Sequence, residues 1–116
     1  FLDAASKQLV DIFQPDIQYV GGVTAAVKIC HIAEAAGIQV MMHLGSNDSY
    51  GQHVCYAMPS NTYGELFVET ASGASLYDGF RPTPGMALPK NGYLVPSGAP
   101  GFGIELTMEE LESAVA

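Results

Sequence analysis

The segments VDIFQPD (10–16) and IQVMMH (38–43) decide the fold of this chain. Each is short and largely apolar, and each ends on a side chain that can take part in proton transfer. A stretch with helical periodicity, 24–36, lies between them. A strand, a helix and a strand at this spacing predict a parallel βαβ unit, whose two strands end at the same edge of the sheet. Since α/β enzymes hold their catalytic groups at that edge, Asp16 and His43 are candidate partners in acid/base chemistry.

The flanking segments continue this alternation of helix and strand. Residues 1–9 have the pattern of the end of a helix, residues 50–58 that of a short helix, and residues 64–68 that of a third strand. Three such units cannot close a barrel, which takes eight strands and about 250 residues. A small doubly wound domain is the alternative, but an isolated three-stranded parallel sheet would leave two apolar edges open. We therefore expect the sequence to begin inside a larger domain.

The remainder of the chain has a different character. In the segment 70–116, residues 70–103 are rich in Gly and Pro, and Asn-Gly at 91–92 between two short apolar runs predicts a β-hairpin. Thr107 and Glu110 have the spacing of a capping box that opens a last helix. The sequence thus predicts two parts: the strands with their helices over 1–69, and then an arm that packs toward another part of a larger molecule.

Charge and composition exclude several classes of protein. The net charge is −8, from 12 acidic and 4 basic residues. So few cations cannot follow a phosphate backbone, so nucleic acid is not an expected partner. No apolar run approaches the roughly 20 residues of a membrane span, so no membrane is expected either. Cys30 and Cys55 lack metal-ligand spacing and are interpreted as buried free thiols rather than as a disulfide. This cysteine usage is typical of a reducing compartment, and we expect a cytoplasmic protein.

Four short motifs occur together in the order and spacing of a known family: QPD (14–16), GGVT (21–24), VMMH (40–43) and PGFG (100–103). Over nearly the whole chain they resemble the C-terminal part of the enolase superfamily, mandelate racemase subgroup. The resemblance implies an α/β fold in which this chain forms strands 6–8 and the C-terminal arm of a modified TIM (β/α)7β barrel. The remainder of the barrel and an N-terminal capping domain are then its partners, and a homo-oligomer is expected.

The resemblance also implies roles for three residues. His43 matches the general base at the end of strand 7, and Asp16 matches the strand-6 carboxylate that hydrogen-bonds this base. Glu65 matches an acid that hydrogen-bonds the substrate carboxylate, although Glu69 competes with it for this role. Related subgroups use lysine bases, and no lysine lies near Asp16 in the sequence, which favours the histidine/aspartate type. The family's Mg²⁺ ligands lie on strands 3, 4 and 5, so the sequence assigns no metal ligand to this chain.

Two further residues are candidate substrate contacts, each with a structural alternative. Asn47 lies in the polar loop GSNDSY (45–50) that follows His43, where it and its neighbours could instead cap the next helix. His53 lies within that helix and could instead serve in packing. Both interpretations of each residue stay open at this point.

The implied chemistry is removal of the weakly acidic proton next to a carboxylate. This step needs a base and strong stabilisation of the enediolate. Loss of a β-hydroxyl then gives a 2-keto-3-deoxy acid, and the polar loop after His43 suits a sugar acid better than an aryl substrate. The resemblance therefore implies a Mg²⁺-dependent sugar-acid dehydratase, a lyase, without specifying the sugar acid. The alternatives are a racemase or epimerase with the same intermediate, a non-catalytic fragment or paralogue, and a small binding module.

Overall fold

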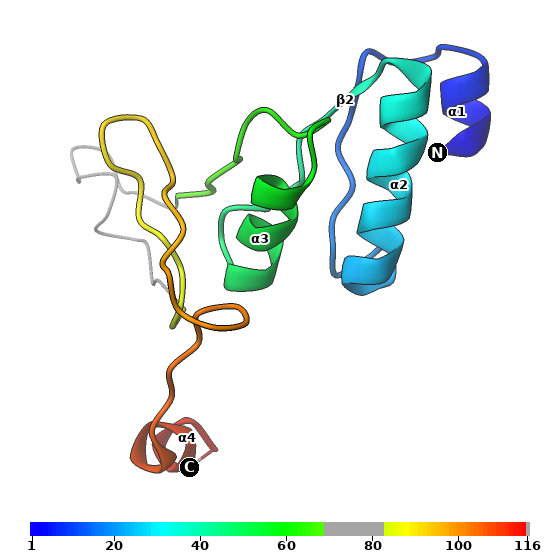
Figure 1. Cartoon of the computed structure of the whole chain (residues 1–116). Helices are drawn as coiled ribbons and strands as arrows, with labels where there is room; N and C mark the ends of the chain where they lie inside the picture. Colours follow the sequence, from blue (N-terminus) through cyan, green and yellow to red (C-terminus); the bar gives the residue numbers. More distant parts are fainter. Residues whose placement is uncertain (69–82, 116) are drawn as a thin grey trace.

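The computed structural model describes residues 1–68 and 83–115, which Figure 1 draws in colour. Short helices and strands alternate in the first range, and an extended arm that ends in a helix forms the second. In chain order the elements are α1 (Leu2–Ser6), β1 (Ile12–Phe13), α2 (Gly22–Ala36), β2 (Gln39–Val40), α3 (Ser49–Ala57) and α4 (Met108–Val115). None of the helices in these two ranges has the length and apolar character that crossing a membrane requires.

The predicted parallel βαβ unit is confirmed. β1 pairs with β2 in parallel register, with Ile12 opposite Gln39, and α2 connects the two strands. Both strands are shorter than predicted, and they end early because Pro15 has no N–H to donate to the ladder. The alignment nevertheless continues, since the amide of His43 donates to the carbonyl of Pro15 over 3.0 Å and Asp16 forms a parallel bridge with His43. The two candidate catalytic residues are therefore neighbours at one edge of the sheet.

Glycines set both ends of α2. Gly21 and Gly22 have φ angles of 106° and 83°, a left-handed conformation that turns the chain from the first strand into the helix. At the other end Gly37 has a φ angle of 69°, and the amide of Ile38 donates to the carbonyl of Ala33 over 2.8 Å. This closes the helix in the manner of a Schellman motif. The crossover connection therefore has two defined ends, and the strands enter and leave it in fixed directions.

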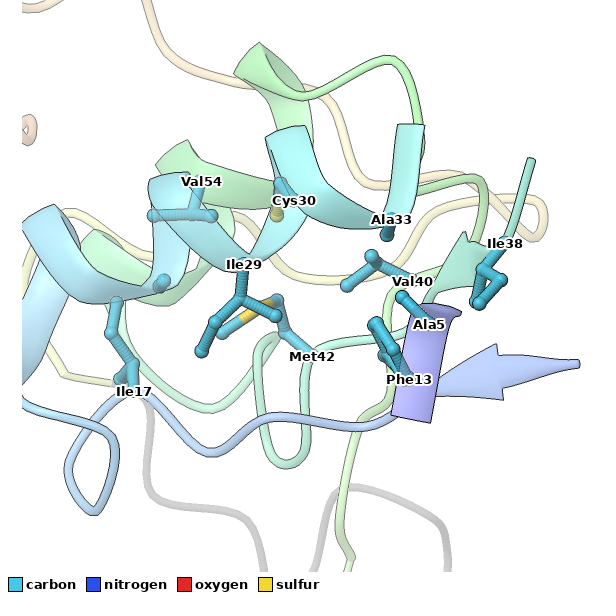
Figure 2. Close-up of a cluster of buried hydrophobic side chains, with 11 residues drawn as sticks. Ala5, Phe13, Ile17, Ile29, Cys30, Ala33, Ile38, Val40, Met42 and Val54 are labelled. Carbon is cyan, nitrogen blue, oxygen red and sulfur yellow. The ribbon is translucent and has the colours of Figure 1, made fainter. Parts of the chain in front are cut away.

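One contiguous core holds the strands against the helices (Figure 2). Its side chains come from α1, both strands, α2 and α3, and from residues next to the strands. Full burial of each larger apolar side chain contributes about 1.5–3 kcal/mol. The buried residues are Ala5, Phe13, Ile17, Ala26, Ile29, Cys30, Ala33, Ile38, Val40, Met42 and Val54.

The third strand predicted over 64–68 is wrong. The chain instead meets β2 at an earlier point, where the amide of Val40 donates to the carbonyl of Ser60 over 2.8 Å and Val40 forms a parallel bridge with Asn61. The side chain of Asn61 then takes the next position of the ladder and accepts a hydrogen bond from the amide of Met42 over 3.2 Å. Because a side chain replaces the backbone acceptor there, regular pairing ends before residue 64.

A buried amide joins α3 to two other segments. Gln52 is only 1% exposed. Its Nε2 donates to the carbonyl oxygens of Ser46 and Ala87, over 3.0 and 2.9 Å. Its Oε1 accepts hydrogen bonds from the amide of Ala87 and the hydroxyl of Tyr56, over 2.8 and 3.2 Å. The arm is thus attached to the same loop that follows β2, through one satisfied side chain.

Two local predictions in the arm are confirmed. Asn91 and Gly92 have φ angles of 52° and 81°, and the residues on either side exchange backbone hydrogen bonds of 2.8 and 3.0 Å, as in a tight hairpin. Thr107 and Glu110 form the capping box: Glu110 Oε2 accepts from the amide of Thr107 and Thr107 Oγ1 accepts from the amide of Glu110. The predicted boundary between the two parts, at 69–70, lies outside the described residues.

Both cysteines are free thiols, as predicted. Cys30 lies fully inside the core, and Cys55 on α3 is partly buried. Burial raises the pKa of both thiols, that of Cys55 to about 11. Such thiols behave as small apolar side chains rather than as nucleophiles.

Candidate active site

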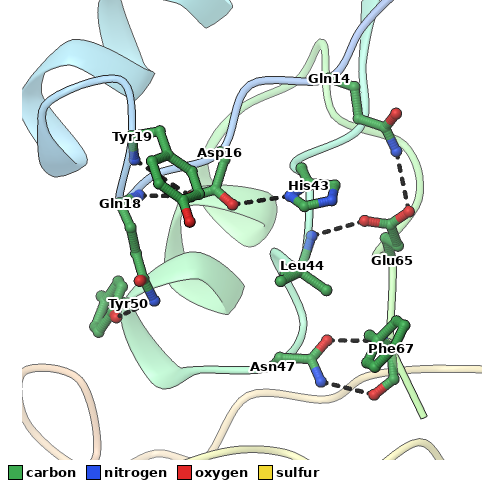
Figure 3. Close-up of polar contacts among 10 residues, drawn as sticks. All are labelled: Gln14, Asp16, Gln18, Tyr19, His43, Leu44, Asn47, Tyr50, Glu65 and Phe67. Carbon is green, nitrogen blue, oxygen red and sulfur yellow. Dashed lines mark hydrogen bonds and ion pairs between the residues drawn. The ribbon is translucent and has the colours of Figure 1, made fainter. Parts of the chain in front are cut away.

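A histidine and an aspartate are in contact at the carboxyl-terminal edge of the two strands (Figure 3). His43 Nδ1 lies 2.8 Å from Asp16 Oδ2. The parallel register that places the two residues opposite each other follows from the βαβ unit, so the sheet itself brings them together. The pairing expected from the sequence is therefore present.

Asp16 is held on both of its carboxylate oxygens. While Oδ2 faces His43, Oδ1 accepts hydrogen bonds from the amides of Gln18 and Tyr19, over 2.8 and 3.4 Å. The hydrogen bond with His43 is the largest influence on the pKa of Asp16 and lowers it; partial burial opposes this, and the two amide bonds add to the lowering. The carboxylate is thus ionised and fixed in direction at neutral pH.

This arrangement determines which nitrogen of His43 can act as a base. An ionised carboxylate is an acceptor only, so Nδ1 carries the proton that lies between the two groups. The lone pair of the neutral ring is then on Nε2, which has no hydrogen-bond partner in residues 1–68 and 83–115. The His43 side chain is 46% exposed and that of Asp16 13%. An exposed imidazole that a partly buried carboxylate orients is suited to general-base catalysis.

Glu65 lies on the other side of His43 (Figure 3). Its Oε2 accepts a hydrogen bond from the amide of Leu44 over 2.7 Å, and its Oε1 accepts one from Gln14 Nε2 over 3.0 Å. Leu44 has a φ angle of 51°, which is uncommon for a residue with a side chain. This turn directs the amide of Leu44 at the carboxylate, and the amide of Ser46 donates to the Glu65 carbonyl over 2.9 Å. The structure therefore brings Glu65 to the same edge as the His43–Asp16 pair.

Asn47 binds the backbone of a neighbouring segment. Its Nδ2 donates to the carbonyl of Phe67 over 2.8 Å, and its Oδ1 accepts from the amide of the same residue over 2.7 Å. Asp48, the next residue, caps α3, and its side chain accepts from the amide of Gly51. Burial raises the pKa of Asp48. The capping alternative is thus confirmed for Asp48. Asn47 instead holds the backbone at Phe67, two residues after Glu65.

His53 lies among aromatic rings. Its ring meets those of Tyr56 and Phe102 edge to face, with centroid distances of 5.8 and 5.4 Å. These contacts join α3 to the PGFG turn of the arm, and the hydrogen bonds of Asp16, His43 and Glu65 do not include this ring. Its role as a substrate contact stays a prediction.

Sequence reasoning missed Gln14 and Gln18. Gln14 contacts Glu65, and Gln18 Nε2 donates to the hydroxyl of Tyr50 over 3.4 Å. A signal for Gln14 exists, because a strand directs residues i and i+2 to the same face, so that Gln14 and Asp16 share one face of the first strand. No comparable signal exists for Gln18.

The described residues do not form a magnesium site. In those residues no three His, Cys, Asp or Glu side chains converge as metal ligands would. Both carboxylate oxygens of Asp16 and of Glu65 are also engaged by hydrogen-bond donors of the protein. Mg²⁺ prefers near-octahedral oxygen coordination, which this pair of separately held carboxylates does not offer.

The chain is similar to known proteins over most of its length. A family model described as enolase C-terminal domain-like matches residues 1–111. A protein of Caldivirga maquilingensis, provisionally named L-rhamnonate dehydratase, is 34% identical over 103 residues, which cover 88% of this chain and 25% of the relative. The chain thus spans about a quarter of the length of this curated relative. No solved structure gives a significant match. The chain belongs to the enolase C-terminal domain-like family of the enolase superfamily, whose α/β domain is related to the TIM barrel.

Proposed function

We propose that this chain provides the acid/base residues of a Mg²⁺-dependent sugar-acid dehydratase. The observation that supports this most is the 2.8 Å contact between His43 Nδ1 and Asp16 Oδ2, with Nε2 free to accept a proton. The 34% identity to a relative provisionally named as a rhamnonate dehydratase supports the substrate class. Rhamnonate and related sugar acids are the substrates to test first.

The reaction begins with proton removal from the carbon next to the substrate carboxylate. His43 Nε2 takes this proton, and the electrons of the broken C–H bond pass into the enediolate. Asp16 stabilises the imidazolium that results, because its carboxylate already faces Nδ1. On the other side Glu65, in its carboxylic acid form, donates a hydrogen bond to an oxygen of the substrate carboxylate. The imidazolium then gives its proton to the departing β-hydroxyl, water leaves, and the enol tautomerises to a 2-keto-3-deoxy acid.

Members of the enolase superfamily generally use Mg²⁺, which stabilises the negative charge of such intermediates. The proposal places the ligands of this ion on barrel strands 3, 4 and 5, outside this chain. The residues described above bind and orient the substrate and move its protons; they do not hold the ion.

The proposal also assigns the chain to strands 6–8 and the C-terminal arm of the barrel, with the arm over 70–116. Large apolar side chains on α1, on β1 and between them are exposed, among them Leu2, Leu9 and Ile12. Neighbouring barrel elements would cover these side chains, which supports the remainder of the barrel as a partner. The capping domain is the proposed partner of the arm.

A direct assay tests the function. The full-length protein with Mg²⁺ is incubated with a panel of sugar acids, and keto acids are detected with semicarbazide. We expect a keto-acid product from at least one acid and its loss in His43→Asn. His31→Asn is the matched control, because His31 is exposed on α2 and distant in sequence from the strand ends. Exchange of the α-proton with D₂O without keto acid would indicate a racemase instead. The absence of both keto acid and proton exchange would refute the proposal.

A further inference from the structure

The carboxylate of Glu65 is held from two sides by two different segments. From the segment after β1, Gln14 Nε2 donates to Oε1 over 3.0 Å, and from the turn after β2, the amide of Leu44 donates to Oε2 over 2.7 Å. Two donors on opposite oxygens of a planar group fix both its position and its rotation. Figure 3 shows how the resulting bridge from Gln14 to Glu65 passes beside His43.

We propose that Gln14 is a positioning residue that sets the direction in which Glu65 presents its carboxylate to the substrate. This inference rests on the proposed function, in which Glu65 binds the substrate carboxylate. Gln14 and Asp16 lie on either side of the buried Pro15 in the segment that follows β1, so one segment orients both the base and the substrate-binding acid. Asp16 does this through His43, and Gln14 does it through Glu65.

Gln14 is the side chain through which this geometry can be changed. The other donor to the carboxylate is a backbone amide, which no ordinary substitution removes. The backbone of Glu65 is tied separately, because its carbonyl accepts from the amide of Ser46. Loss of the Gln14 amide therefore leaves the backbone of Glu65 in place. The carboxylate is then held only by the hydrogen bond from the amide of Leu44 to Oε2, and it can rotate about that hydrogen bond. Gln14 is exposed in this chain, so its substitution removes no part of the core.

Two variants separate the donor from the shape of the side chain. Gln14→Met keeps the length of the side chain and removes the donor. The loss of one hydrogen bond to the Glu65 carboxyl group corresponds to a fall in kcat/KM of about 2- to 10-fold. Gln14→Glu keeps the shape but places a second acceptor against Glu65, so we expect a larger loss. Gln39→Met is the matched control, because Gln39 is an exposed glutamine of β2 without a side-chain hydrogen bond among the described residues.

A double-mutant cycle in the full-length enzyme distinguishes positioning from a general structural effect. Gln14→Met is combined with Glu65→Gln, and kcat/KM is measured for the four proteins. If Gln14 acts through Glu65, its substitution has little further effect once Glu65 is changed. Losses that multiply would overturn the inference, as would an unchanged kcat/KM in Gln14→Met.

A second measurement does not depend on activity. Crystal structures of the full-length protein and of Gln14→Met are compared at Glu65. We expect the carboxylate to change its orientation or to adopt more than one conformer in the variant. A carboxylate that stays in place on the amide of Leu44 would overturn the inference. If the wild-type protein has neither dehydration nor proton exchange with any acid tested, the proposed function fails, and the crystallographic comparison still decides the role of Gln14.

Discussion

Substitution of Asp16 by Asn changes a single atom of the site and tests the acid/base assignment. Asp16 accepts hydrogen bonds on both oxygens: from His43 on one, and from the amides of Gln18 and Tyr19 on the other. An asparagine has only one oxygen, so it can serve only one of these two sides. With that oxygen on the amides, its NH₂ group faces His43 Nδ1 and draws the ring into the tautomer that carries its proton on Nε2.

The size of the effect follows from this tautomer. An imidazole with a proton on Nε2 cannot accept the substrate proton there, so the general-base contribution of about 10²–10⁴-fold is lost. The same exchange in the serine-protease triad lowers kcat by about 10⁴-fold. We expect kcat of Asp16→Asn to fall by about 10³-fold, which corresponds to about 4 kcal/mol of transition-state stabilisation. If the amide turns the other way, two backbone donors lose their acceptor and the turn after the strand is weakened.

The assay is keto-acid formation by the full-length protein, together with exchange of the substrate α-proton in D₂O. Asp11→Asn is the control, since Asp11 undergoes the same chemical change in an exposed position near the start of the same strand segment. The variant should have the circular dichroism spectrum of the wild type. If Asp16→Asn kept a kcat within about threefold of wild type, the assignment of Asp16 as the partner of the base would be refuted.

Three further predictions concern stability and can be measured in the full-length protein. Gln52→Met leaves four hydrogen-bond partners of a buried amide unpaired and should lower the free energy of unfolding by about 2–4 kcal/mol; urea unfolding curves that coincide with those of Gln39→Met would contradict this. The pKa of Asp16 in the folded protein lies below its ordinary value of 3.8, so its stabilising effect is complete above that pH and is lost as the pH falls through the lowered pKa. The difference in the free energy of unfolding between wild type and Asp16→Asn should therefore become smaller below pH 3.8. A difference that grew in acid would contradict a lowered pKa of Asp16 in the folded protein. Thr107→Ala removes the capping box with Glu110, which costs about 1 kcal/mol, and should speed hydrogen exchange in α4, whereas Thr107→Ser should not.

The His43–Asp16 pair could be predicted because its signals are local. Two apolar segments that each end on a titratable residue, with one helix between them, specify a parallel pair whose ends coincide. The Asn91–Gly92 hairpin and the Thr107 capping box were predictable for the same reason, since each depends on a few adjacent residues.

The remainder of the site depends on contacts that leave no pattern in the sequence. Gln14 and Glu65 are 51 residues apart, and the other donor to Glu65 is the backbone of Leu44 in an uncommon conformation. The apolar pattern of 64–68 suits a strand, but pairing is decided by competition between backbone and side chains. The side chain of Asn61 accepts the hydrogen bond from the amide of Met42 that a backbone carbonyl would accept in a regular ladder, so the ladder ends there.

The partly buried thiol of Cys55 is a natural reporter of motion in the loop that follows His43. With a pKa of about 11, roughly one such thiol in ten thousand is a thiolate at pH 7, and alkylating agents attack only that form. A side chain added at Gly45, in the loop beside His43, would meet the Cys55 sulfur at 3.1 Å, so this loop lies directly against it. Because Cys55 is only partly buried, alkylation at neutral pH is slow mainly for want of thiolate. Separation of the loop from α3 exposes the sulfur further, so the rate of thiol labelling rises with that motion, without any probe being introduced into the protein.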